Sequence, residues 1–211
     1  MRKLKFEDCK AYLLELARLI DSNKWLLIEL DSKTGDGDLG LTMSLAFKKA
    51  RELTLNYEDE QEDIGRFFSK IGFTISKAIP CTMSSLLGAG FLRVGSTLGG
   101  KTELTAEDFN LFTQSFSEGV MERGKVKPGD RTLLDTLYPV AEATKKAIAT
   151  DANLSLLIKT AYDVALEGLE STKSMAPTRG KALHHKEQSV GLPDQGATVG
   201  MLIYKSWTKF I

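Results

Sequence analysis

The chain has 211 residues, which is enough for one domain with a sizeable hydrophobic core. Its 28 lysines and arginines balance its 28 aspartates and glutamates, so a net charge of zero gives no electrostatic reason to expect a nucleic-acid or anionic-membrane partner. The two cysteines form neither a CxxC pair nor a Cys/His cluster, which argues against a disulfide framework and against structural zinc.

The N-terminal twenty residues do not resemble a signal peptide, because charged residues interrupt their apolar positions and no small-residue cleavage site follows. No stretch reaches the roughly 18 apolar residues that a membrane span needs. We therefore expect a soluble, cytoplasmic protein with no membrane partner.

Apolar residues recur mostly at helical spacing, and strand signals are nearly absent. A capping box at 105–108 should begin one helix, Pro80 should end another, and Pro139 should kink a third. In chain order, the first helix is predicted over 4–20, with a continuation from 25 towards 31. A second begins at 39 and runs past 47, and the others span 64–78, 83–98, 105–123, 132–149, 154–173 and 196–210. The pattern predicts an all-α protein of about eight helices, with residues 1–211 forming a single domain.

The segment from Asp31 to Gly40 carries three carboxylates within eight residues, and glycines interrupt any regular structure between them. Carboxylates this close repel one another unless a cation lies between them, and hard oxygen ligands suit Mg²⁺ or Ca²⁺. The segment is neither an EF-hand nor a Walker A loop, because it lacks the Glu of the first and the GK[ST] of the second. Asp-Gly pairs are also common in plain turns, so both interpretations stay open for this segment alone.

Two further segments, 124–135 and 178–197, combine polar side chains with glycines that break helices. Like the 31–42 segment, each precedes or begins a predicted helix. Some twenty residues, 175–194, lack any periodicity, which is unusual in a compact helical domain and is typical of functional loops. A helical domain that gathers these three segments at one end could form a phosphate and metal site there.

These segments contain three ordered motifs, GDGDLGLTM at 35–43, GDRTLLD at 129–135 and RGKALHHKEQSVGLPDQGA at 179–197. Together they resemble the L subunit of dihydroxyacetone kinase. The order, the spacing and the chain length agree with that family over about residues 5–210. The resemblance implies a barrel of eight antiparallel helices that binds nucleotide at one end.

The resemblance also implies the residues of the site. Asp31, Asp36 and Asp38 match three aspartates that hold two Mg²⁺ ions against the phosphates of ADP or ATP, and Lys181 matches an arginine beside those phosphates, which makes it the expected catalytic side chain. The implied nucleotide-binding positions are Leu39, Gly40, Leu41, Thr42, Thr82, Met83, Gly124, Leu133, Lys181, Asp194, Gln195 and Gly196.

This chain departs from the family pattern around the phosphates. Leu39 replaces a histidine, Gln188 replaces an arginine, and a Gly-rich phosphate loop has become the glycine-free segment 80–85. Lys181 replaces an arginine and so cannot make that residue's bidentate hydrogen bonds. The family's DPG sequence has become DQG at 194–196. The metal-binding aspartates are intact, whereas the groups expected to face the phosphates have changed.

The resulting hypothesis is a kinase subunit that passes phosphate from the nucleotide to a small ketose such as dihydroxyacetone. In the family it resembles, a separate K subunit holds the ketose, so a K-type partner is expected, in some systems together with an M-type phosphotransferase subunit. A homodimer is also expected. The alternative is a non-catalytic nucleotide-binding or regulatory paralogue, which the altered phosphate loop would fit.

Several other side chains keep two interpretations. His184 and His185 could ligate a metal, although an exposed or hydrogen-bonding role is simpler. Cys81 is expected to be a buried, inert thiol. Trp25 and Trp207 are expected in the core or at an interface.

The 124–135 segment leaves similar choices. Asp130 and Asp135 could contact nucleotide, and Asp130 could equally be a helix N-cap. Lys125, Lys127 and Arg131 could reach phosphate or lie in a solvated loop.

Overall fold

The computed structural model describes residues 2–211, and its helices confirm the all-α prediction. Within these residues the only strands are the two-residue β1 (Leu4–Lys5) and β2 (Glu103–Leu104), which pair antiparallel. The ten α-helices are α1 (Phe6–Ser22), α2 (Lys24–Thr34), α3 (Leu39–Leu55), α4 (Ile64–Ala78), α5 (Thr82–Thr97), α6 (Ala106–Gly124), α7 (Leu134–Ile148), α8 (Leu154–Ser171), α9 (Lys186–Ser189) and α10 (Gln195–Lys205). Short 3₁₀ turns follow at η1 (Thr172–Ser174), η2 (Lys181–His185) and η3 (Ser206–Phe210).

Two differences account for the ten helices of residues 2–211, where about eight were predicted. Asn23 divides the N-terminal stripe into α1 and α2, and its side chain donates to the carbonyl oxygen of Leu19 at 2.8 Å. The one-turn α9 lies inside the segment that was expected to be irregular. The remaining helices follow the predicted spans closely, and α4 matches its predicted bounds.

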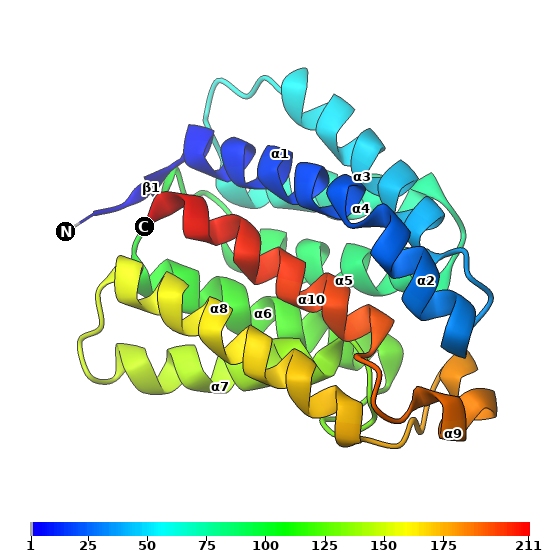
Figure 1. The fold of residues 1–211 in the computed structure, drawn as a ribbon. Coiled ribbons are helices and arrows are strands. Elements are labelled where there is room, and N and C mark those ends of the chain that lie inside the picture. Colours follow the sequence, from blue (N-terminus) through cyan, green and yellow to red (C-terminus); the bar gives the residue numbers. More distant parts are fainter. Residues whose placement is uncertain (1) are drawn as a thin grey trace.

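Helices that are neighbours in sequence also pack as neighbours in space, as α4 does with α5 and α7 with α8 (Figure 1). Glycines bring α4 and α5 close together: a Cβ atom on Gly72 would lie 2.7 Å from the carbonyl oxygen of Gly88. The Gly-rich stretch on α5 therefore allows the close helix packing expected of it.

An aromatic cluster in the core joins helices from the two ends of the chain. Trp207 on η3 stacks on Tyr12 of α1 with ring centroids 3.8 Å apart, and it meets Phe112 of α6 edge-on at 5.3 Å. Trp207 is buried, as predicted, whereas the side chain of Trp25 is 74% exposed and is not a core residue. In Figure 1, β1 and the C-terminus lie at one end of the molecule and α9 lies at the other.

Side-chain caps fix where several helices begin. The predicted capping box at Thr105 and Asp108 is present, and Asn153 caps α8 by accepting the Leu156 N–H at 3.0 Å. Asp194 caps α10 in the same way, accepting the Ala197 N–H at 2.8 Å. No helix in the described residues is long and apolar enough to cross a membrane.

Candidate functional site

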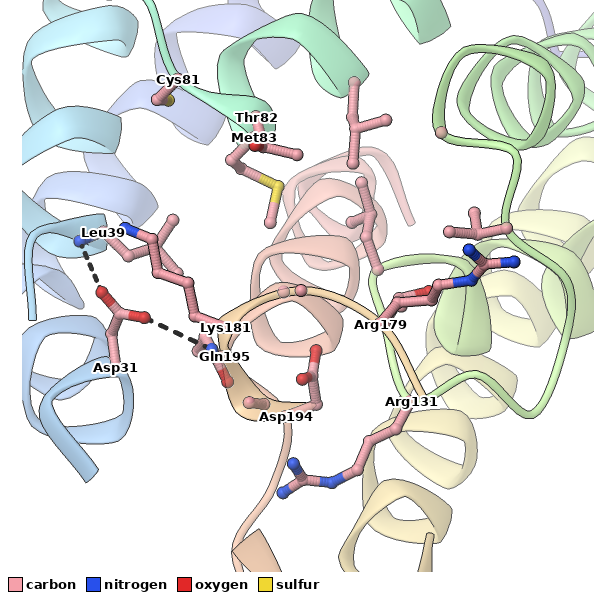
Figure 2. Close-up of a pocket in the computed structure, with 18 of the residues that line it drawn as sticks. Asp31, Leu39, Cys81, Thr82, Met83, Arg131, Arg179, Lys181, Asp194 and Gln195 are labelled. Carbon is pink, nitrogen blue, oxygen red and sulfur yellow. Dashed lines mark hydrogen bonds between the residues drawn. The ribbon is translucent and has the colours of Figure 1, made fainter. Parts of the chain in front are cut away.

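A cavity of about 340 Å³ opens at the end of the molecule that carries α9. The structure brings all three polar segments together there, because residues from 31–42, 124–133 and 179–196 line the cavity with the start of α5 (Figure 2). Of the sequence-predicted residues, the lining includes Asp31, Asp36, Asp38, Leu39, Thr42, Thr82, Met83, Gly124, Leu133, Lys181, Asp194, Gln195 and Gly196.

The three aspartates converge at one side of this cavity. Each offers a carboxylate oxygen, and these oxygens lie within 4.8 Å of one another. Asp31 is on the last turn of α2, where it accepts the Leu39 N–H at 3.1 Å, and the Asp36–Asp38 turn passes through Gly37 at a φ of +76°. Three hard oxygen donors at this spacing fit a divalent cation such as Mg²⁺.

Residues of the C-terminal segment reach this acidic cluster. Lys181 on η2 donates to the Asp36 carboxylate. Gln195 at the start of α10 donates to Asp31 at 3.3 Å and accepts the Thr34 hydroxyl at 3.2 Å. The glutamine that appeared in the sequence as a departure from the family pattern therefore orients one of the three carboxylates.

The opposite wall is formed by the first turn of α5 and by apolar side chains. Thr82 and Met83 lie on that turn, whose free N–H groups favour an anion. Met83, Leu86, Val126 and Leu133 supply an apolar lining next to it. A polar end for phosphate and an apolar wall for a base are both present in one cavity.

Cys81 differs from its predicted role. It is half-buried, lines the cavity, and caps α5 by accepting the Ser84 N–H on its Sγ atom at 3.3 Å. The expectation of a buried, inert thiol is therefore wrong as to burial, because this end of α5 faces the cavity.

Most of the 129–135 segment is buried, including both of its aspartates. Asp135 accepts N–H groups from Gly129 and Thr132, both at 2.6 Å, and burial raises the pKa of its carboxyl group. Asp130 is not an N-cap, because α7 begins at Leu134; it accepts the Thr178 hydroxyl at 2.6 Å, which lowers its pKa.

The three basic residues of this region do not act as one group. Arg131 is only 1% exposed, so it is not part of a solvated loop; it belongs to the cavity lining, and its contact with phosphate stays a prediction. Lys125 and Lys127 are exposed and do not line the cavity. Sequence spacing could not separate them, since the contacts of Arg131 come from residues far along the chain.

Asp194 is a buried carboxyl group in the cavity lining. Burial raises its pKa to about 6, although the Ala197 N–H and the Arg131 guanidinium both favour the charged form. A carboxylate that is desolvated and yet faces a cavity is typical of a functional position.

Some predicted site residues lie outside the cavity lining. A Cβ atom on Gly40 would lie 2.2 Å from the carbonyl oxygen of Lys24, so Gly40 serves the packing of α3 on α2, and Leu41 points outward with 52% exposure. His184 is exposed, and His185 pairs with Gln188 at 2.8 Å, so neither histidine lines the cavity.

The structure adds residues that sequence reasoning did not assign to the site. Leu86 lies one turn after Met83 on α5, and that helical spacing could have identified it. Arg179 also lines the cavity, and its guanidinium lies 3.7 Å from the Asp130 carboxylate. The RGK run at 179–181 was the available signal, because it places two cations in one loop.

An all-α domain with an acidic cluster and a helix N-terminus facing one cavity belongs to the class of proteins that can hold a metal-bound polyphosphate. Residues 33–209 match the DAK2 domain model. The chain belongs to the DAK2 domain family, and within it the chain is DhaL-like.

Relatives agree with this assignment. The ADP-binding subunit DhaL of the PEP-dependent dihydroxyacetone kinase of Escherichia coli (strain K12) is 30% identical over 177 residues, which are 84% of this chain and 83% of that protein. The D-erythrulose kinase of Mycolicibacterium smegmatis is 28% identical over 205 residues, covering 94% of this chain and 35% of that protein.

A solved structure has the same fold. It is the dihydroxyacetone kinase from C. freundii in complex with AMP-PNP and Mg²⁺, with a TM-score of 0.69 and 24% identity over 95% of this chain. This chain covers 33% of the length of that kinase. The likeness shows that the fold is shared along nearly the whole chain.

Proposed function

We propose that this protein is the nucleotide-binding, phosphoryl-transferring subunit of a small-ketose kinase, and that it holds ADP or ATP through two Mg²⁺ ions. The observation that carries the proposal is the convergence of the Asp31, Asp36 and Asp38 oxygens in a cavity that the N-terminus of α5 also faces. The names of the kinase relatives, and of the solved kinase with AMP-PNP and Mg²⁺, support it.

In this proposal each wall of the cavity has one task. The three aspartates are the metal ligands, and Gln195 keeps Asp31 oriented towards the other two. Mg²⁺ held there would neutralise the charge that develops on the transferred phosphoryl group. The N–H groups at the start of α5 would bind phosphate oxygens, and the apolar wall around Leu86 would hold the base.

Lys181 is the proposed catalytic side chain. It is on η2 at the metal end of the cavity, where its ammonium group pairs with Asp36. A nucleotide phosphate entering this end would offer the same ammonium group a second anionic partner. Positioning and electrostatics then supply most of the catalysis, and no covalent nucleophile is needed.

A K-type partner that presents the ketose is part of the proposal. Among the relatives, the matching domain is a subunit of its own in Escherichia coli and about a third of the D-erythrulose kinase. The same helical domain thus occurs both apart from and joined to other kinase parts. An M-type partner, the identity of the ketose and a homodimer stay predictions.

The test is a coupled assay that combines the purified protein, a K-type subunit, ATP and a panel of trioses and tetroses. We expect sugar phosphate only when both proteins are present, and none when Asp38→Asn replaces the wild type. Sugar phosphate made by the purified protein alone, above the level of the Asp38→Asn control, would contradict the need for a partner.

The regulatory alternative is favoured by one observation, the glycine-free 80–85 segment, in which Cys81 caps α5. It predicts tight binding of ADP with Mg²⁺ together with no transfer to any ketose in the same assay.

A further inference from the structure

Arg131 is a fully buried cation that contacts the chain at both ends of residues 175–193, the segment that covers the cavity. Its Nε atom donates to the Thr172 carbonyl oxygen at 3.0 Å, before the segment begins. Its Nη2 atom donates to the carbonyl oxygens of Ser189 at 2.7 Å and Leu192 at 2.9 Å, near the segment's end. One side chain therefore fixes the two points from which the intervening residues extend.

The backbone of Arg131 is held in an unfavourable conformation for this purpose. Its φ is +58°, in the left-handed region that residues with a Cβ atom seldom adopt. In Figure 2 the side chain extends beneath Asp194, on the side away from Met83. Arg131 belongs to the cavity lining, and its hydrogen bonds are directed at the base of the covering segment.

The preceding residue makes a second tie to the same segment. The Asp130 carboxylate accepts the Thr178 hydroxyl at 2.6 Å, and its carbonyl oxygen accepts the Thr178 N–H at 3.3 Å. Its carboxylate also lies 3.7 Å from Arg179. These contacts hold the residues that lead directly into Lys181.

Burying a guanidinium group in this way costs desolvation free energy. Burial lowers the pKa of Arg131, while Asp194 favours its charged form, and the Nη1 atom has no hydrogen-bond partner among the described residues. Apolar packing would serve stability alone at least as well. The three carbonyl contacts, which suit a planar fork and not a point charge, are what this cation adds.

We propose that Arg131 is a positioning residue, which holds residues 175–193 across the cavity so that Lys181 reaches the acidic cluster. In this role its guanidinium acts through hydrogen bonds to the backbone on either side of and within that segment. The inference rests on the proposed function only for its effect on nucleotide binding, because the position of the segment is a property of the protein without ligand.

Hydrogen–deuterium exchange of the intact protein tests the proposal directly. In Arg131→Met, we expect the amides of 175–193 to exchange about tenfold faster, while those of α4, α5 and α6 keep their wild-type protection. Arg131→Lys retains the charge but not the fork, so it should show a smaller, equally local effect. Arg66→Met is the matched control, because Arg66 is an exposed arginine that pairs with Asp59 outside the cavity lining.

Calorimetric titration with ADP and Mg²⁺ supplies the second measurement. We expect about tenfold weaker binding in Arg131→Met, partial recovery in Arg131→Lys, and no change in Arg66→Met. If wild-type protein binds no nucleotide, the proposed function fails while the exchange experiment still decides the role of Arg131.

Arg131→Lys also keeps the test decisive if Arg131→Met does not fold. A folded Arg131→Lys protein that exchanges like wild type throughout 175–193 would overturn the proposal. Faster exchange spread equally over all helices would overturn it too, since that result describes a general stability role.

Discussion

Replacing Asp194 by asparagine should stabilise the protein at neutral pH and not in acid. The amide can still cap α10 by accepting the Ala197 N–H, but it has no charge to desolvate. The pKa of Asp194 is raised to about 6 in the folded protein, against an unfolded value near 3.9. At about 1.4 kcal/mol per pKa unit, the folded state is penalised by roughly 3 kcal/mol at pH 7.

The sign follows from proton binding. The folded protein binds the Asp194 proton more tightly than the unfolded chain, so the favourable contribution is complete below about pH 4 and is lost as pH rises through about 6. The free energy of unfolding of wild type should therefore decrease relative to that of Asp194→Asn progressively between these pH values. Above about pH 7 the difference between the two free energies should be constant.

Urea unfolding of both proteins at intervals from pH 4 to pH 8 measures this difference. Other carboxyl groups titrate in both proteins, so subtracting one curve from the other isolates Asp194. Asp63→Asn is the matched control for exchanging a capping carboxylate for an amide, because Asp63 caps α4 by accepting the Arg66 N–H. A difference between Asp194→Asn and wild type that does not grow from pH 4 to pH 7 would refute the reasoning.

Three further substitutions separate the roles of individual residues. Lys181→Gln should bind Mg²⁺ alone up to about fivefold more tightly, since the ammonium group no longer competes with the metal for Asp36. The same variant should bind ADP more weakly. Calorimetry that finds both affinities lowered would contradict this competition between Lys181 and Mg²⁺. Thr105→Ala should cost about 1 kcal/mol in urea unfolding by removing the capping box, and an unchanged midpoint would count against it. Gly40→Ala should lower the melting temperature and weaken nucleotide binding together, because the new Cβ atom forces α3 away from the Lys24 carbonyl oxygen. Weaker binding at an unchanged melting temperature would instead mean that Gly40 contacts the nucleotide.

Local sequence signals were sufficient for most helix boundaries. Helix α4 ends where Pro80 requires, and the capping box at Thr105 begins α6 as its pattern indicates. The break at Asn23 was missed, because the apolar stripe continues across it and the side-chain bond to Leu19 leaves no apolar signature. Periodicity reports which face of a helix is buried, and it is nearly silent about a change of direction between two helices.

The candidate site divides along similar lines. The three polar segments could be chosen from composition alone, and the structure brings all three to one cavity. The inward direction of Arg131 could not be predicted, because its acceptors lie 41 to 61 residues further along the chain. The bond from Gln195 to Asp31 could not be predicted for the same reason, since the two residues are 164 positions apart. Local spacing identifies candidate ligands, whereas the contacts that orient them are long-range.

The most direct measurement is a calorimetric titration of wild type and Asp36→Asn with ADP, in the presence and absence of Mg²⁺. A site built on the Asp31, Asp36 and Asp38 oxygens should bind ADP tightly in wild type only when Mg²⁺ is present. The asparagine variant keeps an oxygen but loses a charge that two divalent ions require, so its Mg²⁺-dependent binding should disappear. An ADP affinity that is the same in both proteins, or that ignores Mg²⁺, would contradict the metal-bound nucleotide site.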